Sequence, residues 1–240
     1  APLGGMGAFV RPGERIALPA GPLSERAAKD ILRQAGLAFP REILVPPDGD
    51  AGAAAAEIGF PVVLKVSSPD IAHKTDVGGV AVNLKSDEEV RRTYGLMMSQ
   101  VRDRMPSARV SGVTVEKMFS GREVIVGMVR DETFGPVITF GLGGIFVEIM
   151  KDVSQRIVPV TEGMVDDMIR SIKAYPILTG ARGRRPADIE ALKKIIFGVA
   201  QIAMDFPEIM ELEINPVMVG DAGQGCGAVD ALVTIRRVVQ

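Results

Sequence analysis

The pattern of apolar residues in the first part of the chain alternates between helix-like and strand-like periods. In three stretches apolar residues recur every three to four positions, which predicts helices over 25–35, 51–58 and 87–104. Short apolar or alternating runs between them predict strands over 43–45, 62–66 and 80–84. Ser86 is the expected N-cap of the longest helix, because three acidic residues follow it in the first turn.

From residue 110 onward the dominant period becomes two, which is typical of an antiparallel sheet. The strands expected here cover 113–118, 124–129, 137–140, 145–150 and 156–159. Two helices follow, over 162–172 and 188–204, and two closing strands over 209–219 and 228–235. The sheet region therefore differs in character from the mixed region that precedes it.

The order of these elements predicts an α+β (α/β) protein with two joined lobes and a cleft between them. Residues 1–22 are rich in Gly, Pro and Ala without any period, so we expect a linker or arm. We expect the N-terminal lobe to cover residues 23–118 and the C-terminal lobe to cover residues 119–240.

The composition narrows the possible classes of function. The 240 residues carry a formal net charge of −2 and no tryptophan, so neither charge nor base stacking argues for nucleic acid or an anionic membrane. A single cysteine excludes a disulfide framework and a thiolate metal cluster. No apolar run is long enough to span a bilayer, and the first ten residues lack the features of a signal peptide. We therefore expect a protein of the reducing cytoplasm.

The stretch from Phe60 to Gly79 carries the first candidate site. Lys65 interrupts a buried, β-branched strand, and a lysine in such a place needs a partner, so we expect it to reach an anion. A polar loop with the only histidine, His73, follows and ends on a glycine pair where the backbone can turn tightly. The combination indicates a phosphate site, although it is not a Walker A motif. The alternatives are a lysine that extends to the strand end and an ordinary loop histidine.

A second candidate combines an acidic strand end with a nearby acid. Glu116, Lys117 and Met118 close one predicted strand, and Glu123 lies seven residues after Glu116. An acid beside an exposed backbone edge and a methionine can line an adenine slot, and a second acid can accept ribose hydroxyls. The alternative is a charged strand rim, because isolated acids at strand ends are usually solvated.

A third candidate lies on the two closing strands. Alternation places Glu211, Glu213 and Asn215 on one face of a strand, and Asp230 lies in an apolar run of the next strand. Oxygen-bearing side chains grouped in this way suit a hard cation such as Mg²⁺. A solvated polar face is the alternative, but like charges two residues apart repel without a counter-ion.

A glycine cluster between two apolar strands, at residues 140–148, is the fourth candidate. Its backbone amides can meet a phosphate, or it can be a plain hairpin. No catalytic triad can be proposed, because His73 is the only histidine and Cys226 lies in a glycine-rich hairpin.

Taken together, these motifs resemble a known family. From Leu23 to Arg236 the chain is similar to the ATP-grasp β subunit or β domain of the NDP-forming acyl-CoA synthetases (ADP-forming acetyl-CoA synthetase), which are relatives of succinyl-CoA synthetase. The motifs that carry the resemblance are Phe60–Val66, Ile71–Val80, Glu116–Met118, Arg122-Glu123, the glycine cluster, Lys151–Val153, Gly180–Gly183, Glu211–Pro216 and Ala228–Asp230.

The resemblance implies an ATP-grasp fold in which ADP or ATP lies between two antiparallel-sheet lobes. The implied nucleotide contacts are Lys65 for the phosphates, Glu116, Lys117 and Met118 for the adenine, and Glu123 for the ribose. The implied Mg²⁺ ligands are Asn215 and Asp230, with Glu213 nearby.

The resemblance also implies a reaction and a partner. In the family an α part binds CoA and carries a phosphohistidine, and His73 matches a loop histidine that delivers the phosphoryl group to ADP. The relay would convert acyl-CoA, phosphate and ADP into acid, CoA and ATP, reversibly. The α part is absent from this chain, so we expect full turnover only with it, in a hetero- or homo-oligomer. The acyl substrate and the choice between ADP and GDP stay open, as does whether the chain is a free subunit or part of a fused protein.

Two other functions fit parts of the same pattern. One is a regulatory ATP-grasp module fused to a protein acetyltransferase, in which the catalytic histidine tends to be missing, so the presence of His73 argues against it. The other is an ATP-grasp carboxylate–amine ligase, which forms an acyl phosphate directly and needs no loop histidine. Radiolabel transfer with and without a change at His73 separates the acyl-CoA synthetase function from the carboxylate–amine ligase function.

Overall fold

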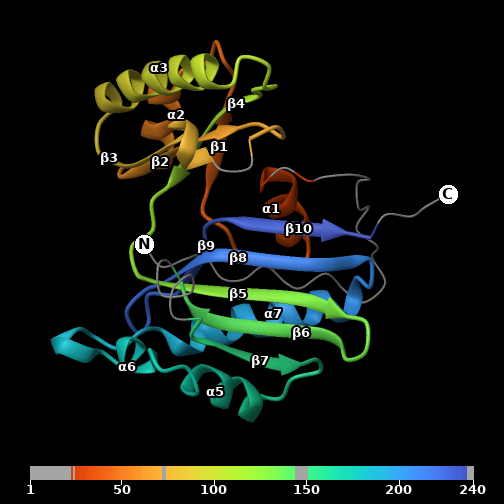
Figure 1. The fold of residues 1–240 in the computed structure, drawn as a ribbon. Coiled ribbons are helices and arrows are strands. Elements are labelled where there is room, and N and C mark those ends of the chain that lie inside the picture. Colours follow the sequence, from red (N-terminus) through yellow and green to blue (C-terminus); the bar gives the residue numbers. More distant parts are fainter. Residues whose placement is uncertain (1–22, 24, 72–73, 144–150, 237–240) are drawn as a thin grey trace. The chain divides into compact units, whose positions relative to one another are not determined.

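The computed structural model describes residues 23, 25–71, 74–143 and 151–236 (Figure 1). Within that part the chain forms two compact units, each with its own hydrophobic core. The smaller unit comprises residues 40–119, and the larger unit combines residues 120–236 with 23–39. No helix in the described part is long and apolar enough to cross a membrane.

The smaller unit is a four-stranded antiparallel sheet with two helices on one face. Its strand order is β1-β4-β2-β3, and α2 and α3 share the core with alternate residues of β2 and β4, such as Leu64 and Val115. The elements are β1 (Glu42–Val45), α2 (Ala51–Ile58), β2 (Val62–Ser67), η1 (Lys74–Val77), β3 (Val80–Leu84), α3 (Asp87–Arg104) and β4 (Gly112–Lys117).

The expected cap of the long helix is confirmed. The Ser86 hydroxyl accepts a hydrogen bond from the Glu89 N–H, and the Glu89 carboxylate accepts one from the Lys85 N–H at 2.8 Å. The first bond satisfies a backbone donor that a helix start otherwise leaves without a partner, and the second attaches the residue before the cap to the first turn. The start of α3 is therefore determined by residues adjacent in sequence, which is why the periodicity located it well.

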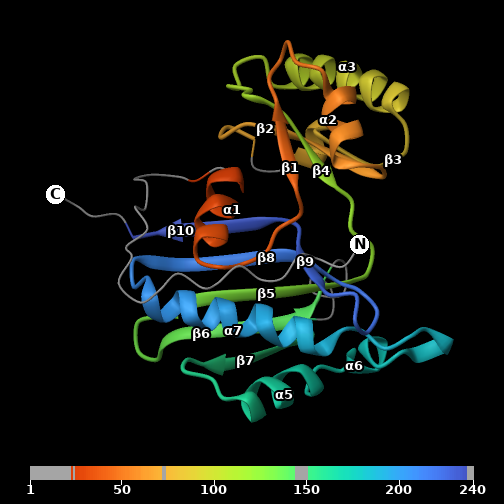
Figure 2. The same ribbon diagram turned by 180° about the vertical axis from the view of Figure 1, so that it is seen from behind.

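The larger unit is an antiparallel sheet in the order β10-β8-β5-β6-β7, with β9 paired to β8. Helix α7 runs along one face and lies in front of the sheet in Figure 2. The strands are β5 (Arg122–Asp131), β6 (Gly135–Leu142), β7 (Val153–Ile157), β8 (Ile209–Val219), β9 (Cys226–Ala228) and β10 (Ala231–Ile235). The helical elements are α1 (Glu25–Gln34), α5 (Glu162–Arg170), α6 (Tyr175–Leu178), η2 (Ala181–Gly183) and α7 (Ile189–Asp205).

The structure corrects the expected boundary between the lobes. Helix α1 was expected in the N-terminal lobe, yet residues 23–39 belong to the larger unit. The reason is the apolar face of α1, since Ala28 and Leu32 are buried in the same core as Val233 of β10. Periodicity shows that a helix has an apolar face, but it does not show which sheet that face covers.

Two other details differ from the expected elements. The strand expected over 156–159 is β7, which lies earlier at Val153–Ile157. The last expected strand divides into β9 and β10, with Val229 and Asp230 between them. The strand expected over 145–150 lies wholly outside the described residues.

Candidate functional site

Lys65 and Glu116 form a buried ion pair on the smaller sheet. Both side chains point to the face opposite α2 and α3, because Lys65 alternates with Leu64 and Val66, whereas Glu116 alternates with Val115. The Lys65 Nζ lies 3.2 Å from the Glu116 Oε2, and the two residues are only 7% and 2% exposed. Glu116 therefore supplies the partner that a buried lysine needs, and the Lys65 side chain is buried rather than exposed at the strand end, whereas the phosphate contact stays a prediction.

The segment Lys117–Met118 is held by backbone contacts that the sequence did not reveal. The Lys117 ammonium donates to the carbonyls of Gly59 and Phe60 at 2.7 and 2.8 Å, and the Met118 N–H donates to the Pro61 carbonyl at 3.1 Å. β4 lies between β1 and β2, so the exposed backbone edge expected at Glu116–Lys117 does not exist. An interior strand has its ladder donors and acceptors occupied on both sides.

The loop that contains His73 is anchored on both flanks, although Ala72 and His73 themselves lie outside the described residues. After the histidine, the Gly79 N–H donates to the Lys74 carbonyl at 2.7 Å, and the Gly79 carbonyl accepts from the Val66 N–H at 2.8 Å. A Cβ on Gly79 would lie 2.4 Å from the Val66 side chain. The glycine pair therefore allows the close backbone approach that was predicted, and it holds η1 against the strand of Lys65.

Before the histidine, Asp70 anchors the loop to a distant arginine. The Asp70 carboxylate accepts hydrogen bonds from the Arg109 N–H and from its Nε and Nη2 atoms, at 2.8, 2.9 and 2.7 Å. The Arg109 side chain, followed by its backbone N–H, lowers the pKa of Asp70 to about 2. Sequence reasoning missed this pair, since a separation of 39 residues leaves no local signal.

On the larger sheet, the face opposite α7 carries the second group of candidate residues. Leu212 and Ile214 of β8 are buried in the core, and Glu213 and Asn215 alternate with them on the other face, as predicted. β5 pairs with β8 in a register that places Gly127 opposite Glu213, and Glu123 lies four residues before Gly127, on the same face of β5. Glu123 therefore lies on the same face of the same sheet as Glu213 and Asn215, which the sequence alone could not show.

Asn215 and Asp230 are neighbours across two adjacent chain segments. The Asn215 N–H donates to the Asp230 carbonyl at 3.2 Å, and the Asn215 Nδ2 donates to the Glu213 Oε1 at the same distance. One Asp230 carboxylate oxygen accepts the Ala231 N–H at 2.8 Å. Because its amide nitrogen is occupied by Glu213, Asn215 directs its amide oxygen elsewhere.

The oxygen donors of Glu213, Asn215 and Asp230 are of the kind that a hard cation prefers. Two carboxylates and one amide oxygen are the ligand types that Mg²⁺ prefers, and Mg²⁺ usually keeps several waters and substrate phosphate oxygens besides a few protein ligands. Among the described residues, however, no three acidic, histidine or cysteine side chains converge on a single ion position. The arrangement therefore suits an ion held jointly with a nucleotide better than a closed protein site.

The glycine cluster is explained in part by contacts between strands. A Cβ on Gly141 would lie 2.8 Å from the Asp152 carbonyl, and a Cβ on Gly143 would lie 3.1 Å from the backbone of Glu123. Phe140 is buried in the core. These two glycines allow neighbouring backbone to approach, and residues 144–148 lie outside the described part of the chain.

Comparisons with known proteins identify the family and the fold. The sequence matches the ATP-grasp domain family over residues 17–235. It is 50% identical to the beta subunit of acetate–CoA ligase (ADP-forming) I from Pyrococcus furiosus, over 82% of this chain and 85% of that subunit. It is 49% identical to acetate–CoA ligase (ADP-forming) I from Archaeoglobus fulgidus, over 70% of this chain and 25% of that enzyme. The chain therefore spans most of a separate subunit and about a quarter of a longer relative.

Solved structures of one enzyme share the fold. The dinucleotide forming acetyl-coenzyme A synthetase 1 of Ca. Korarchaeum cryptofilum, in complex with coenzyme A, Ca-AMPCP and HgCl+, matches with a TM-score of 0.83 and 41% identity, over 89% of this chain and 93% of that chain. A second structure of it holds coenzyme A and Mg-AMPPCP, with its phosphohistidine segment pointing towards the nucleotide binding site. That structure matches with a TM-score of 0.77 and 40% identity, over 90% of this chain and 93% of that chain.

The expected fold and family are thus confirmed, while the roles of the individual site residues stay predictions. The buried lysine–glutamate pair, the oxygen-rich face of β8 and the anchored loop therefore lie on a chain similar to acetate–CoA ligases (ADP-forming) of two organisms. The chain belongs to the ATP-grasp family, among the nucleotide-binding β subunits and β domains of ADP-forming acyl-CoA synthetases.

Proposed function

We propose that this chain binds a Mg²⁺–nucleotide and moves a phosphoryl group between a phosphohistidine and ADP. The full reaction is acyl-CoA, ADP and phosphate giving acid, CoA and ATP. The observation that carries the proposal is the buried Lys65–Glu116 pair, because it holds an oriented cation on the sheet face opposite α2 and α3. The nucleotide analogues in the Korarchaeum structures support the choice of ligand.

Lys65 supplies positive charge to the nucleotide phosphates, and Glu116 fixes the direction of its side chain. Phosphoryl transfer depends mainly on positioning and on charge stabilisation, so a pre-oriented ammonium is useful there. Lys117 acts by holding the start of β2 through two carbonyls. Met118 offers its side chain to the adenine, because its N–H is already bonded to Pro61.

Asn215 and Asp230 hold Mg²⁺ with help from Glu213, and Glu123 accepts the ribose hydroxyls. When bound, the ion supplies charge neutralisation between phosphate oxygens. The hydrogen bond from Asn215 to Glu213 supports this assignment, since it orients the amide so that its oxygen is the remaining ligand. The Mg-AMPPCP complex of the Korarchaeum enzyme supports the identity of the ion.

His73 carries the phosphoryl group between the partner and the nucleotide. A neutral imidazole nitrogen attacks phosphorus while the P–N bond to the partner's histidine breaks, and a terminal oxygen of ADP then displaces His73 and forms the P–O bond of ATP. An ordinary histidine pKa near 6.5 leaves most of the side chain neutral at pH 7. The two anchors at Asp70 and Gly79 support this role, because they restrict where the loop begins and ends.

The partner is a CoA-binding α part that carries the first phosphohistidine. The naming of the Pyrococcus relative as a beta subunit supports a separate partner chain, and the threefold greater length of other relatives is consistent with fusion. We propose that turnover requires both parts in one oligomer. Acyl specificity belongs to the α part, so the acid itself is not assigned.

The test is a quench experiment with the chain and its α partner, using labelled phosphate with acyl-CoA and ADP. The His73→Ala variant should abolish ATP formation, because the second phosphate carrier is missing, while label still reaches the α histidine and stops there. ADP binding should be unchanged, since the carrier makes no adenine or ion contact. Lys74→Ala, a change at the next residue, is the control and should retain most of the turnover. ATP synthesis near the parental rate in His73→Ala would rule out the relay.

A further inference from the structure

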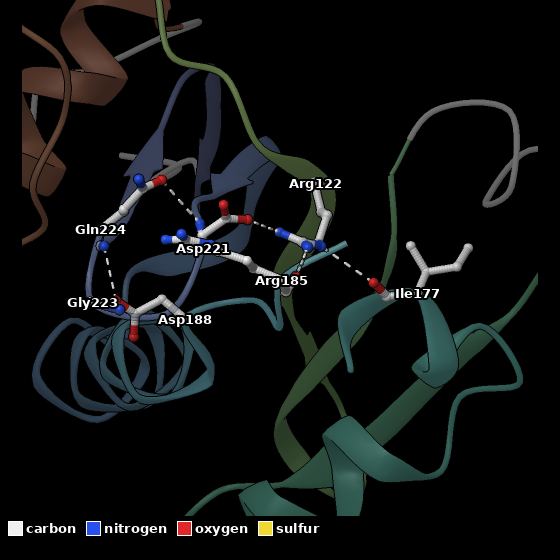
Figure 3. A network of polar contacts seen from close by, with 8 residues as sticks. Arg122, Ile177, Arg185, Asp188, Asp221, Gly223 and Gln224 are labelled. Carbon is white, nitrogen blue, oxygen red and sulfur yellow. Dashed lines mark hydrogen bonds and ion pairs between the residues drawn. The ribbon is translucent and has the colours of Figure 1, made fainter. Parts of the chain in front are cut away.

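Arg122, the first residue of β5, is a buried cation that connects three separate segments (Figure 3). Its Nε donates to the Ile177 carbonyl at 3.2 Å, its Nη1 to the Asp221 Oδ1 at 3.0 Å and its Nη2 to the Arg185 carbonyl. The residue is only 7% exposed. A planar guanidinium with donors in fixed directions can satisfy three acceptors at once, which an ammonium cannot do in the same geometry.

Two of the segments that Arg122 connects are also hydrogen-bonded to each other. Asp188 caps α7 by accepting the Ala191 N–H at 3.0 Å, and its other carboxylate oxygen accepts the Gly223 and Gly225 N–H groups at 3.0 and 2.8 Å. The loop before α7 and the turn between β8 and β9 are therefore joined to each other. Arg122 attaches the start of β5 to this rigid support.

Glu123 follows directly and projects to the opposite face of the sheet, and its backbone is fixed by two glycines. The Glu123 carbonyl accepts the Gly143 N–H at 2.8 Å, and a Cβ on Gly143 would crowd Glu123 at 3.1 Å. A Cβ on Gly121 would lie 2.5 Å from the Val219 carbonyl. Close backbone packing on both sides and the buried guanidinium together leave little freedom at Glu123.

The same strand offers a natural comparison at its other end. Arg130 also donates from its guanidinium to backbone carbonyls, those of Ala203, Ile209 and Phe206 at 2.7, 3.2 and 3.4 Å. Eight residues of extended chain separate it from Arg122, roughly 26 Å along the strand. Arg130 therefore fastens β5 to the end of α7 with similar chemistry and no connection to Glu123.

We propose that Arg122 is a positioning residue that holds the Glu123 carboxylate where it accepts the ribose hydroxyls of the nucleotide. This inference rests on the proposed function, in which Glu123 is the ribose contact. Arg122 acts through the main chain, because its guanidinium points to the helix side of the sheet while Glu123 lies on the opposite face. The consequence is selectivity for a ribose, rather than fold stability alone.

The experiment compares the affinities for ADP, 2′-deoxyADP and 3′-deoxyADP by calorimetry in the presence of Mg²⁺. The variants are Arg122→Met, Arg122→Lys, Glu123→Gln and the control Arg130→Met, with thermal unfolding measured for each. A hydrogen bond to a charged group corresponds to about a tenfold to hundredfold preference, so the parent should favour ADP by roughly this factor over one of the deoxy forms. A ratio of affinities is insensitive to a general loss of stability.

We expect Arg122→Met and Glu123→Gln to abolish the preference for ribose, and Arg122→Lys to restore part of it. Arg130→Met should keep the preference for ribose, even if its unfolding temperature falls as far as that of Arg122→Met. In the double variant, Arg122→Met should add nothing to Glu123→Gln, because the two residues act on one contact. A parental preference in Arg122→Met, or additive losses in the double variant, would overturn the positioning role while leaving the ribose contact. A parental preference in Glu123→Gln would remove the ribose contact of the proposed function itself.

Discussion

Three lysines are buried in the described part of the chain, and their partners distinguish their roles. Lys29 lies 2.7 Å from Glu25 on the same helix, and Lys193 contacts three acids on α5 and α7. The contact of Lys29 lies within one helix, and those of Lys193 lie within α7 and between α7 and α5. Lys65 pairs with Glu116 across neighbouring strands, on the sheet face opposite α2 and α3. A buried charge must be compensated, and of the three only Lys65 is compensated across a sheet rather than along or between helices.

The first prediction concerns Lys65→Met. It removes the ammonium and keeps most of the stem, so nucleotide affinity measured by calorimetry should fall about tenfold to hundredfold. Because Glu116 would then be left buried with one partner fewer, a second variant, Lys65→Met with Glu116→Leu, separates binding from folding. Lys193→Met is the control, and it should lower the unfolding temperature without changing nucleotide affinity. Parental affinity in a folded Lys65→Met variant would contradict the phosphate role.

The second prediction concerns Asp230→Asn. This change keeps the size of the side chain and removes one ionic oxygen, so the gain in ADP affinity on adding Mg²⁺ should shrink while the affinity without Mg²⁺ stays the same. Glu211→Gln is the matched control. Glu211 lies on the same face of β8 but four residues from Asn215, about 13 Å along the strand, and it accepts a hydrogen bond from Thr234. An unchanged Mg²⁺ effect in Asp230→Asn would remove this residue from the ion site.

Among the elements, the loop between β2 and β3 is attached to the rest of its unit at both ends of its described part. It leaves β2 beside Lys65, is bound by Arg109 at Asp70 and returns to β2 through Gly79. Loops positioned by a rigid scaffold commonly carry catalytic groups. The anchors here are an ion pair and a glycine turn, which hold the described residues on both sides of the histidine.

The third prediction concerns the pH dependence of this anchor. The pKa of Asp70 in the folded state, about 2, lies below its ordinary value of 3.8. The stabilisation is therefore complete above pH 3.8 and is lost as the pH falls toward 2. Asp70→Asn should be less stable than the parent in urea denaturation at neutral pH, and the difference should shrink below pH 3.8. Arg109→Gln should give the same profile, with no added effect in the double variant. A difference that persists unchanged at the lowest pH would contradict the anchor.

At the scale of the whole molecule, the proposed function assigns one half of the phosphoryl relay to this chain. That half can be tested without the α partner. In the proposed reversible relay this chain carries out one half by itself, in which His73 takes the γ-phosphoryl group of ATP while ADP leaves. Incubation with labelled ATP and Mg²⁺ should therefore give an acid-labile label on the parent chain. His73→Ala should remain unlabelled, and Lys74→Ala should label like the parent. Equal labelling of His73→Ala would place the phosphoryl acceptor elsewhere in the chain.

Short-range patterns in the sequence determined most of the elements and several candidate side chains. The cap at Ser86, the alternation of Glu213 and Asn215 with core residues, the turn at Gly79 and the lysine in a buried strand all follow from residues close together in the chain. Caps, periods and turns depend on local backbone geometry, which is why the sequence indicates them.

Only the tertiary structure decided which of these elements are neighbours. The 51 positions from Lys65 to Glu116, the insertion of β4 between β1 and β2, the packing of α1 on the larger sheet and the junction at Arg122 leave no local signal. A period of two shows which face a residue occupies, but strand order and register are decided by packing between distant segments. Lys65 could be recognised as needing an anion from its own strand, whereas the identity of that anion required the folded sheet.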